Sequence, residues 1–354
     1  MKIADFDKNL AVTSRVNRPG IKFYDIDDEP FRLYGIFQTE EDGYHRVPRK
    51  VAEAVSTNLE TICAYTTGGR VRFTTDSPYV AVRVKLREPY SIPFMTFVAT
   101  CGFDVYADNN FAGTMSPPLE VGAEYYDSLV NLGSRTERVI TLNMPLYSNI
   151  DALQIGIDET SSLGRAPDYK YEKPIVYYGS SITNGAVCSR PGLTYEAIIS
   201  RRFDINHVNL GFGGSARGEE SMAKYIASLD MSIFVYDYDH NAPTVKHLEA
   251  THSALFDTVR AAHPKAPVIM ISRPTAVRTE DTEARLAVIR ATYERAVKSG
   301  DTNVYLIDGG EFFDGIGNDW SMDNVHPTDH GFRLMANKIG DVIGKILADG
   351  KADL

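Results

Sequence analysis

The stretch "IVYYGSSITNGAVCSRPG", from Ile175 to Gly192, decides the fold class. It starts with strand-forming residues and runs through Gly-Ser-Ser-Ile-Thr into a loop of small and polar residues. Serines directly after an apolar strand either cap the next helix or take part in chemistry. The two alternatives are separated by what the neighbouring strands bring to the same place.

Apolar strands alternate with helical segments from Pro174 to the end of the chain. The strand-like runs are "IVYYG", "HVNLGF", "SIFVYDY", "PVIMIS" and "NVYLID". This alternation predicts an α/β/α sandwich around a five-stranded parallel sheet. The helices are expected at residues 193–203, 217–228, 246–262, 280–299 and 329–348.

The preceding part of the chain has a different pattern. Residues 1–165 are rich in short runs such as "GGRVRFTTDSPYVAVRVKL", in which apolar and polar residues alternate. This pattern predicts an N-terminal β-sandwich or jelly-roll domain. A polar segment with Gly and Pro follows, so we expect a linker at 166–173 and a catalytic domain at 174–354.

Composition excludes several classes of protein. The 354 residues carry a net charge of −10 without a basic cluster, which argues against nucleic-acid binding. No segment reaches the roughly 18 apolar residues of a membrane span, and the first residues lack a signal-peptide core. Three widely spaced cysteines fit reduced thiols, so we expect a cytoplasmic protein unless a leader has been trimmed. Self-association into a homo-oligomer is left open.

Polar side chains follow most of the predicted parallel strands. Ser180 and Ser181 follow the first strand, "GFGGS" the second and "DYDHNAP" the third, while "DNVHP" comes after the fifth. Because ligand sites in such sheets form at the carboxyl ends of the strands, these groups are expected to meet. Together they provide a hydroxyl, an Asp-x-x-His pair, a glycine turn and an asparagine.

These groups are the parts that acyl transfer needs. A serine attacks when an imidazole takes its proton, and a carboxylate fixes the tautomer of that imidazole. Asp323 precedes His326 by three residues, so it can reach back to Nδ1. Backbone N–H groups of the glycine turn and an asparagine amide can bind the oxyanion, and one such donor contributes about 10²–10³ in rate.

Each motif alone has a structural alternative. The two serines can form a helix cap, "GFGGS" can be a simple turn, and Asp329 fits a helix N-cap. His330 lies four residues after His326, a spacing that can bind metal, but no further ligand is evident. We therefore expect neither a metal nor a cofactor, and the joint occurrence of the motifs favours catalysis.

The motifs resemble the four blocks of the SGNH/GDSL hydrolase superfamily, which implies a flavodoxin-like arrangement of the parallel sheet. The resemblance implies Ser181 as nucleophile, with Asp323 and His326 completing the triad. It also implies an oxyanion hole made by Ser181, Gly214 and Asn241. The stretch 102–106, Gly-Phe-Asp-Val-Tyr, is similar to the Gly-x-Asp-Leu-Tyr signature of an N-terminal β-domain found in one subgroup.

The sequence departs from this pattern in two blocks. Most relatives have Asp where Ser180 stands, and the third block usually has Gly-x-Asn-Asp where this chain has Asp239-His240-Asn241-Ala242. The second departure leaves His240 as an alternative to Asn241 at the oxyanion hole.

The resemblance implies hydrolysis of an ester, and members with an added β-domain often remove acetyl groups from carbohydrates. The expected partner is a small-molecule or oligosaccharide ester, with Arg190, Trp320 and His240 as candidate substrate contacts. Packing or a structural hydrogen bond is the alternative role for Arg190 and Trp320. Two other functions stay open, namely an esterase or thioesterase on a lipid or other small acyl substrate, and a non-catalytic glycan-binding protein.

Overall fold

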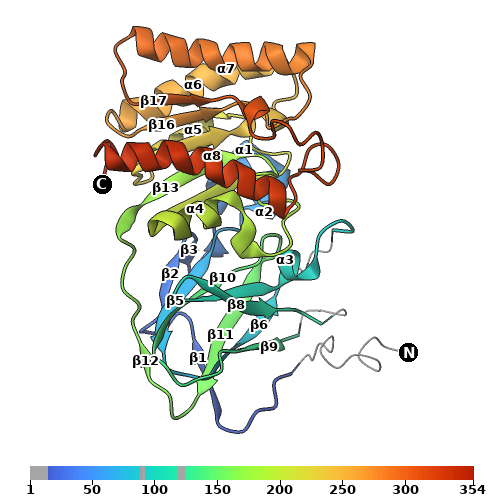
Figure 1. Ribbon diagram of the computed structural model, residues 1–354, viewed down its shortest axis with the longest axis vertical. Helices are drawn as coiled ribbons and strands as arrows, with labels where there is room; N and C mark the ends of the chain where they lie inside the picture. The colour runs from blue at the N-terminus through green and yellow to red at the C-terminus, as the bar shows by residue number, and fades with distance from the viewer. Residues whose placement is uncertain (1–14, 88, 90–91, 119–123) are drawn as a thin grey trace. The chain divides into compact units, whose positions relative to one another are not determined.

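The computed structural model describes residues 15–87, 89, 92–118 and 124–354 (Figure 1). The N-terminal stretch without signal-peptide character lies outside these residues, apart from Arg15. The chain divides into two compact units, a β unit and an α/β unit, which confirms the predicted fold class. The β unit comprises the described residues up to Tyr44 together with Tyr65–Asp168 and Ser189–Gly192, and the α/β unit contains the rest.

Two antiparallel sheets form the β unit. The first has the order β1 (Ile21–Asp25), β11 (Ile150–Asp158), β6 (Tyr79–Leu86) and β9 (Tyr126–Asn131). The second has the order β12 (Leu163–Gly164), β5 (Arg70–Thr75), β10 (Arg138–Asn143), β7 (Phe103–Ala107) and β8 (Asn110–Met115), with β2 (Arg32–Tyr34) also paired to β5. Strands β3 (Phe37–Thr39) and β4 (Gly43–His45) pair with each other.

Apolar residues of both sheets share one core. Val82 and Val84 of β6 are fully buried in it together with Phe73 of β5 and Leu142 of β10. The alternation of apolar and polar residues that predicted these strands therefore places one side chain in two between the sheets.

The hairpin β7–β8 turns at Asp108 and Asn109, whose φ angles of 47° and 64° are those of a tight two-residue turn. The apolar residues before it form a short helix, α3 (Phe97–Cys101). Thr96 caps this helix by accepting a hydrogen bond from the backbone N–H of Ala99.

A parallel sheet is the centre of the α/β unit. Its strand order is β14 (Ile205–Gly211), β13 (Tyr171–Gly179), β15 (Ile233–Asp237), β16 (Val268–Ile271) and β17 (Val304–Ile307). All four strand pairings are parallel, and in chain order the strands run 2-1-3-4-5. The chain adds β14 on one side of β13 and the later strands on the other side, so the strand order reverses between β13 and β15. The loops that follow these two strands therefore border the crevice in which such sheets bind ligands.

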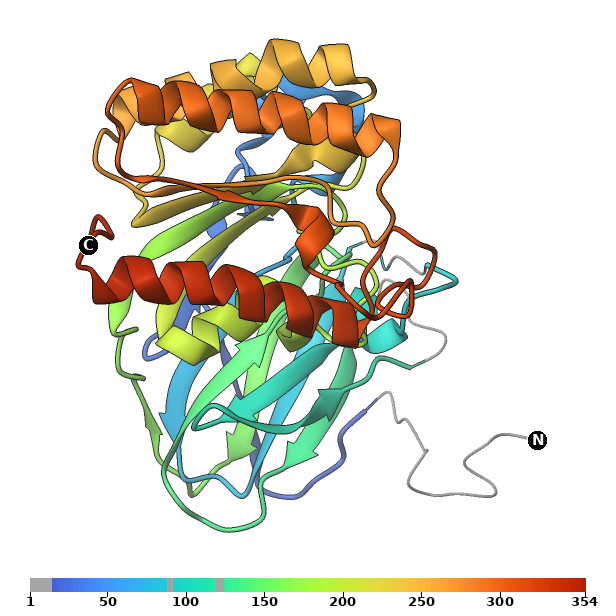
Figure 2. The same ribbon diagram turned by 45° about the horizontal axis from the view of Figure 1, so that its top comes forward.

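Helices cover both faces of this sheet (Figure 2). Helices α5 (Glu220–Ala227), α6 (Val245–Ala262) and α7 (Glu280–Lys298) contribute buried residues to one core cluster. Helices α4 (Tyr195–Phe203) and α8 (Asp329–Ala348) contact each other on the other face. Short 3₁₀ turns lie at Pro191–Leu193, Tyr238–Asn241 and Gly309–Glu311.

An excursion of the N-terminal chain belongs to the α/β unit. Residues His45–Ala64 contain α1 (Arg49–Val55) and α2 (Thr57–Ile62), and their apolar side chains lie in the core cluster of β13, β15 and α5. Val47 and Leu59 are fully buried there. The observed division is thus discontinuous, whereas the sequence predicted continuous domains at 1–165 and 174–354. The sequence of a short amphipathic helix shows an apolar face, but it does not show against which core that face packs.

Candidate active site

The loop after β13 presents two serines in opposite ways. Ser180 is fully buried, and its Oγ accepts a hydrogen bond of 3.1 Å from the backbone N–H of Ile182. Ser181 is partly exposed, and its Oγ lies 2.8 Å from Nε2 of His326. Ser180 thus shapes the turn, while Ser181 faces the imidazole.

A single carboxylate orients this imidazole. His326 Nδ1 lies 2.7 Å from Oδ2 of Asp323, and the backbone N–H of His326 donates to Oδ1 at 2.8 Å. With Nδ1 protonated and donating to Asp323, Nε2 can accept the hydroxyl proton of Ser181. The structure therefore brings the three predicted triad residues into one hydrogen-bonded chain.

Asp323 is held as a carboxylate. Its partial burial alone would raise its pKa, but the hydrogen bonds from the backbone and ring of His326 and from the backbone N–H of Val325 outweigh burial. The pKa of Asp323 consequently lies below its usual range.

The glycine turn after β14 packs against the nucleophile. A Cβ placed on Gly213 would lie 3.4 Å from Cβ of Ser181, and Gly214 has a φ of +69°. The Gly214 N–H donates to Oδ1 of Asn241 at 3.1 Å, and Nδ2 of Asn241 donates to the carbonyl of Phe212 at 2.9 Å. The predicted oxyanion-hole residues thus lie together, with the Gly214 N–H directed at Asn241.

His240 points to a different segment from Asn241. Its Nε2 lies 3.3 Å from the carbonyl oxygen of Pro274. Burial and then the charge of Arg273 lower the pKa of His240 to about 3, and His326 adds to this effect. Of the two neighbours, it is Asn241 whose side chain contacts the glycine turn, while His240 is a neutral imidazole near His326.

Two other candidate substrate contacts have structural partners. Trp320 is fully buried and stacks on Phe313 with 3.8 Å between ring centroids. Arg190 lies in the β unit, where its Nη1 donates to Oδ2 of Asp104 at 2.6 Å and to the hydroxyl of Tyr106 at 2.8 Å. These contacts match the packing and structural alternatives for Trp320 and Arg190. They also give Asp104 and Tyr106 of the Gly-x-Asp-Leu-Tyr-like stretch a role in binding residues 189–192.

The excursion at residues 45–64 supports the glycine turn, a contact that was not predicted from the sequence. Arg46 is fully buried, and its Nη1 donates to the carbonyl of Gly211 at 2.7 Å. Its guanidinium carbon lies 4.4 Å from the ring centroid of Phe212. Asn58 donates to Oγ of Ser215 and to the carbonyl of Gly213. No local motif marks these residues, because their partners are more than 150 positions away in the sequence.

Within the described residues, no group of three His, Cys, Asp or Glu side chains could hold a metal ion. Asp239, two residues after the end of β15, is buried and pairs with Arg285 at 3.0 Å. In the same part of the chain, none of the helices has the length and apolar character needed to cross a membrane.

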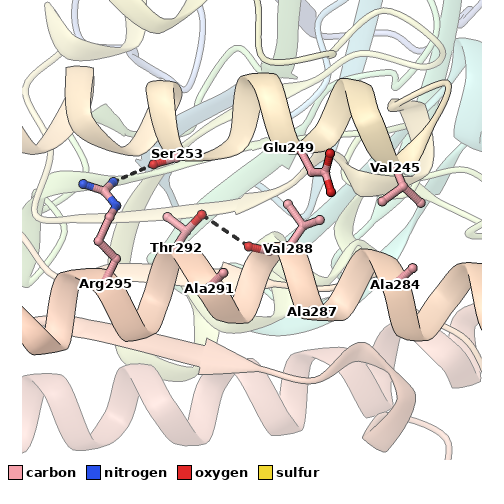
Figure 3. Close-up of a pocket in the computed structure, with 9 residues that line it drawn as sticks. All are labelled: Val245, Glu249, Ser253, Ala284, Ala287, Val288, Ala291, Thr292 and Arg295. Carbon is pink, nitrogen blue, oxygen red and sulfur yellow. Dashed lines mark hydrogen bonds between the residues drawn. The ribbon is translucent and has the colours of Figure 1, made fainter.

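A groove of about 550 Å³ lies between α6 and α7, apart from the residues of the triad (Figure 3). Small side chains of α7, including Ala287 and Ala291, form its floor, and Arg295 at one end is bound to Ser253. Its lining includes two charged residues, Glu249 and Arg295, and Arg295 also pairs with Asp257 at 2.6 Å.

Known proteins resemble both units of the chain. The model of the GDSL-like lipase/acylhydrolase family matches residues 172–344, and the model of the N-terminus of SGNH-hydrolase-type esterases matches residues 21–163. No curated protein matches.

Similar solved structures extend over nearly the whole chain. A Bacteroides ovatus protein described as a GDSL-like lipase is 29% identical, with a TM-score of 0.81, covering 93% of this chain and 98% of its own. The salicylyl-acyltransferase SsfX3 of a tetracycline biosynthetic pathway is 19% identical, with a TM-score of 0.77 and coverages of 94% and 99%. A family two carbohydrate esterase from Clostridium thermocellum, solved with cellohexaose, is 15% identical, with a TM-score of 0.65 and coverages of 90% and 99%. At 19% and 15% identity, the last two similarities show a shared fold alone.

Proposed function

Because this chain belongs to the GDSL-like lipase/acylhydrolase family of SGNH-type esterases, we propose that it is a serine esterase that removes short acyl groups, acetyl above all, from a carbohydrate. Family membership supports ester hydrolysis. The observation that carries the proposal is the continuous chain from Ser181 Oγ through His326 to Asp323, with distances of 2.8 and 2.7 Å. The fold shared with a carbohydrate esterase supports the choice of a sugar ester.

The geometry supports a two-step reaction. Ser181 Oγ attacks the ester carbonyl carbon while its proton passes to Nε2 of His326, and Asp323 stabilises the resulting imidazolium. His326 then gives the proton to the leaving alcohol oxygen, which leaves an acyl-enzyme. Water attacks this ester with His326 again as base, and Ser181 is released.

The oxyanion formed in each step needs donors near Ser181. The Ser181 N–H has no partner in the described part of the chain, and Asn241 Nδ2 has a second hydrogen beyond the one given to Phe212. These two groups can bind the oxyanion in the present arrangement. Gly214 can join them once its N–H turns away from Asn241 Oδ1.

The test is acetate release from p-nitrophenyl acetate and from a panel of acetylated oligosaccharides, for the wild type and Ser181→Ala. We expect the variant to lose activity by orders of magnitude. Ser253→Ala, on the surface of α6, is the matched serine control and should leave the rate unchanged. If the wild type and Ser181→Ala release acetate equally and very slowly, the proposed esterase function is refuted.

The same panel separates the other functions. A preference for p-nitrophenyl octanoate or an acyl thioester over acetate would favour a lipid or small acyl substrate. Binding of oligosaccharides without any hydrolysis would favour a non-catalytic glycan-binding protein.

A further inference from the structure

We propose that Asp237 is a positioning residue that holds the nucleophile loop so that Ser181 stays within reach of His326. Asp237 ends β15, directly beside the end of β13, and its side chain is buried. The inference rests on the proposed esterase function, since it assigns a role in presenting the same serine.

The carboxylate of Asp237 binds the loop on both sides of the nucleophile. Thr183 Oγ1 donates a hydrogen bond to Oδ1, and the backbone N–H of Ser180 also donates to the carboxylate. Tyr195 OH, at the start of α4, lies 3.5 Å from Oδ2. Ser181 therefore lies between two residues fastened to one side chain.

There is no free space between the carboxylate and the turn. A Cβ placed on Gly179 would lie 1.8 Å from Oδ1 of Asp237 and 2.0 Å from Oγ1 of Thr183. The glycine that precedes the two serines is thus required by the close approach of Asp237. Because the carboxylate lies against the turn, it fixes the distance between the turn and the end of the sheet.

Thr183 is held from the other side as well. Asn209 of β14 donates from Nδ2 to the carbonyl of Thr183 at 2.6 Å, and its Oδ1 accepts from the Gly211 N–H at 2.8 Å. The loop of β13 is therefore bound to β15 by the side chain of Thr183 and to β14 by its backbone.

Stability alone gives little reason for an acid at this place. The hydrogen-bond partners of Asp237 are hydroxyls and a backbone N–H, without a lysine or arginine among them in the described part of the chain. Burial, with a contribution from Asp239, raises the pKa of Asp237 to about 7. A buried, unpaired carboxylate costs free energy that an apolar side chain would not, so its placement points to the loop that it holds.

The experiment measures the reactivity of Ser181 with a fluorophosphonate probe and kcat and KM with p-nitrophenyl acetate. In labelling, the Ser181 Oγ–P bond forms as the P–F bond breaks, fluoride leaves and the hydroxyl proton goes to His326. We expect Asp237→Asn and Thr183→Val to lower the labelling rate and kcat by about 10²-fold with little change in KM, since a misplacement of about 1 Å costs that much. Thr183→Ser, which keeps the hydroxyl, should recover most of the rate.

Asp257→Asn changes an exposed carboxylate of α6 and is the matched control, so this variant should behave as wild type. Thermal unfolding of each variant is measured in parallel. Labelling of Asp237→Asn and Thr183→Val at the wild-type rate would overturn the proposal, and so would loss of cooperative unfolding in both, because the carboxylate would then serve the fold. If the wild type itself is labelled no faster than Ser181→Ala, the proposed esterase function has failed instead.

Discussion

At the scale of single residues, Asp323 combines two tasks in one side chain. Oδ1 accepts the backbone N–H groups of Val325 and His326 and so shapes the turn, while Oδ2 meets the His326 ring. An asparagine can keep the first task with its oxygen and place an amide N–H against Nδ1. The substitution therefore separates loop shape from tautomer control.

We expect Asp323→Asn to lower kcat on p-nitrophenyl acetate by about 10⁴-fold. Nδ1 must then accept a hydrogen bond from the amide, so the ring proton lies on Nε2 and Nε2 cannot act as base. KM and the melting temperature should change little. Steady-state kinetics and thermal unfolding measure both. A loss of less than tenfold would show that His326 works without this carboxylate.

Glu196 gives a prediction about pH and stability. It is fully buried in the first turn of α4, and desolvation raises its pKa well above the usual range. The pKa of Glu196 in the folded protein exceeds its unfolded value of about 4.3. Between these two pKa values, folding therefore takes up a proton. The contribution of Glu196 to stability is consequently lost as the pH rises from the unfolded pKa toward the folded one. Glu196→Gln should therefore make stability fall less steeply between pH 4 and 8.

Urea denaturation of the wild type and Glu196→Gln at several pH values tests this expectation. Glu249→Gln, an exposed change on α6, is the matched control and should run parallel to wild type. If the Glu196→Gln curve also runs parallel, Glu196 keeps an ordinary pKa in the folded protein.

At the scale of elements, the buried guanidinium of Arg46 connects the segment that contains α1 and α2 to the glycine turn. Arg46 donates to the carbonyls of Gly211 and Ile62, at 2.7 and 3.1 Å. Arg46→Met keeps much of the volume but leaves these buried carbonyls without donors, at about 1–3 kcal/mol each. We expect the free energy of unfolding to fall by at least about 2 kcal/mol in urea denaturation.

Arg49→Met, on the exposed side of α1, is the control. Arg49 pairs with Glu53 and Glu60 at the surface, where water and salt screen such pairs and leave them little effect on stability. Equal effects of the two substitutions would mean that Arg46 contributes no more than a surface arginine.

In the β unit, Asp104 joins β7 to the segment that follows the nucleophile loop. It is fully buried and accepts Nη1 of Arg190, the Gly192 N–H at 2.9 Å and Nδ2 of Asn143 at 2.8 Å. Asp104→Ala leaves Arg190 without its carboxylate, which costs about 3–5 kcal/mol for a buried pair.

The measurement is again urea denaturation, with Asp151→Ala as control. Asp151 pairs with the half-exposed Arg87 at 2.8 Å, so its removal should cost about 1 kcal/mol or less. A cost for Asp104→Ala no larger than this control would show that Arg190 finds other partners.

The sequence predicted elements better than it predicted partners. Helix α8 was expected at 329–348 and has those bounds, because its apolar face has a clear helical period. The order of the parallel strands follows from the fold class. By contrast, the partners of Arg46 and Arg190 are groups distant in sequence, and no local periodicity or motif predicts them. Trp320 lies next to the catalytic loop in sequence and is nevertheless buried on Phe313.

At the scale of the whole molecule, the α/β unit is built from separated parts of the chain. Its core needs the buried side chains of Val47, Ala52 and Leu59 as well as the strands that begin at Tyr171. We expect the fragment 169–354 alone to expose this face and to lack cooperative unfolding by circular dichroism. The fragment preceded by residues 45–64 through a flexible linker should recover it.

Fluorophosphonate labelling of Ser181 in both fragments provides a second readout. Cooperative unfolding and wild-type labelling of 169–354 without the excursion would show that α1 and α2 are dispensable.

The excursion of residues 45–64 also bears on how such a protein can be made and inherited. During synthesis Val47 and Leu59 leave the ribosome well before β13 and β15, so these apolar side chains must wait for their partners. A recombination event at 166–173 would carry away the nucleophile and its sheet but leave α1 and α2 behind. The two units are therefore expected to pass between genomes as a pair rather than as exchangeable modules.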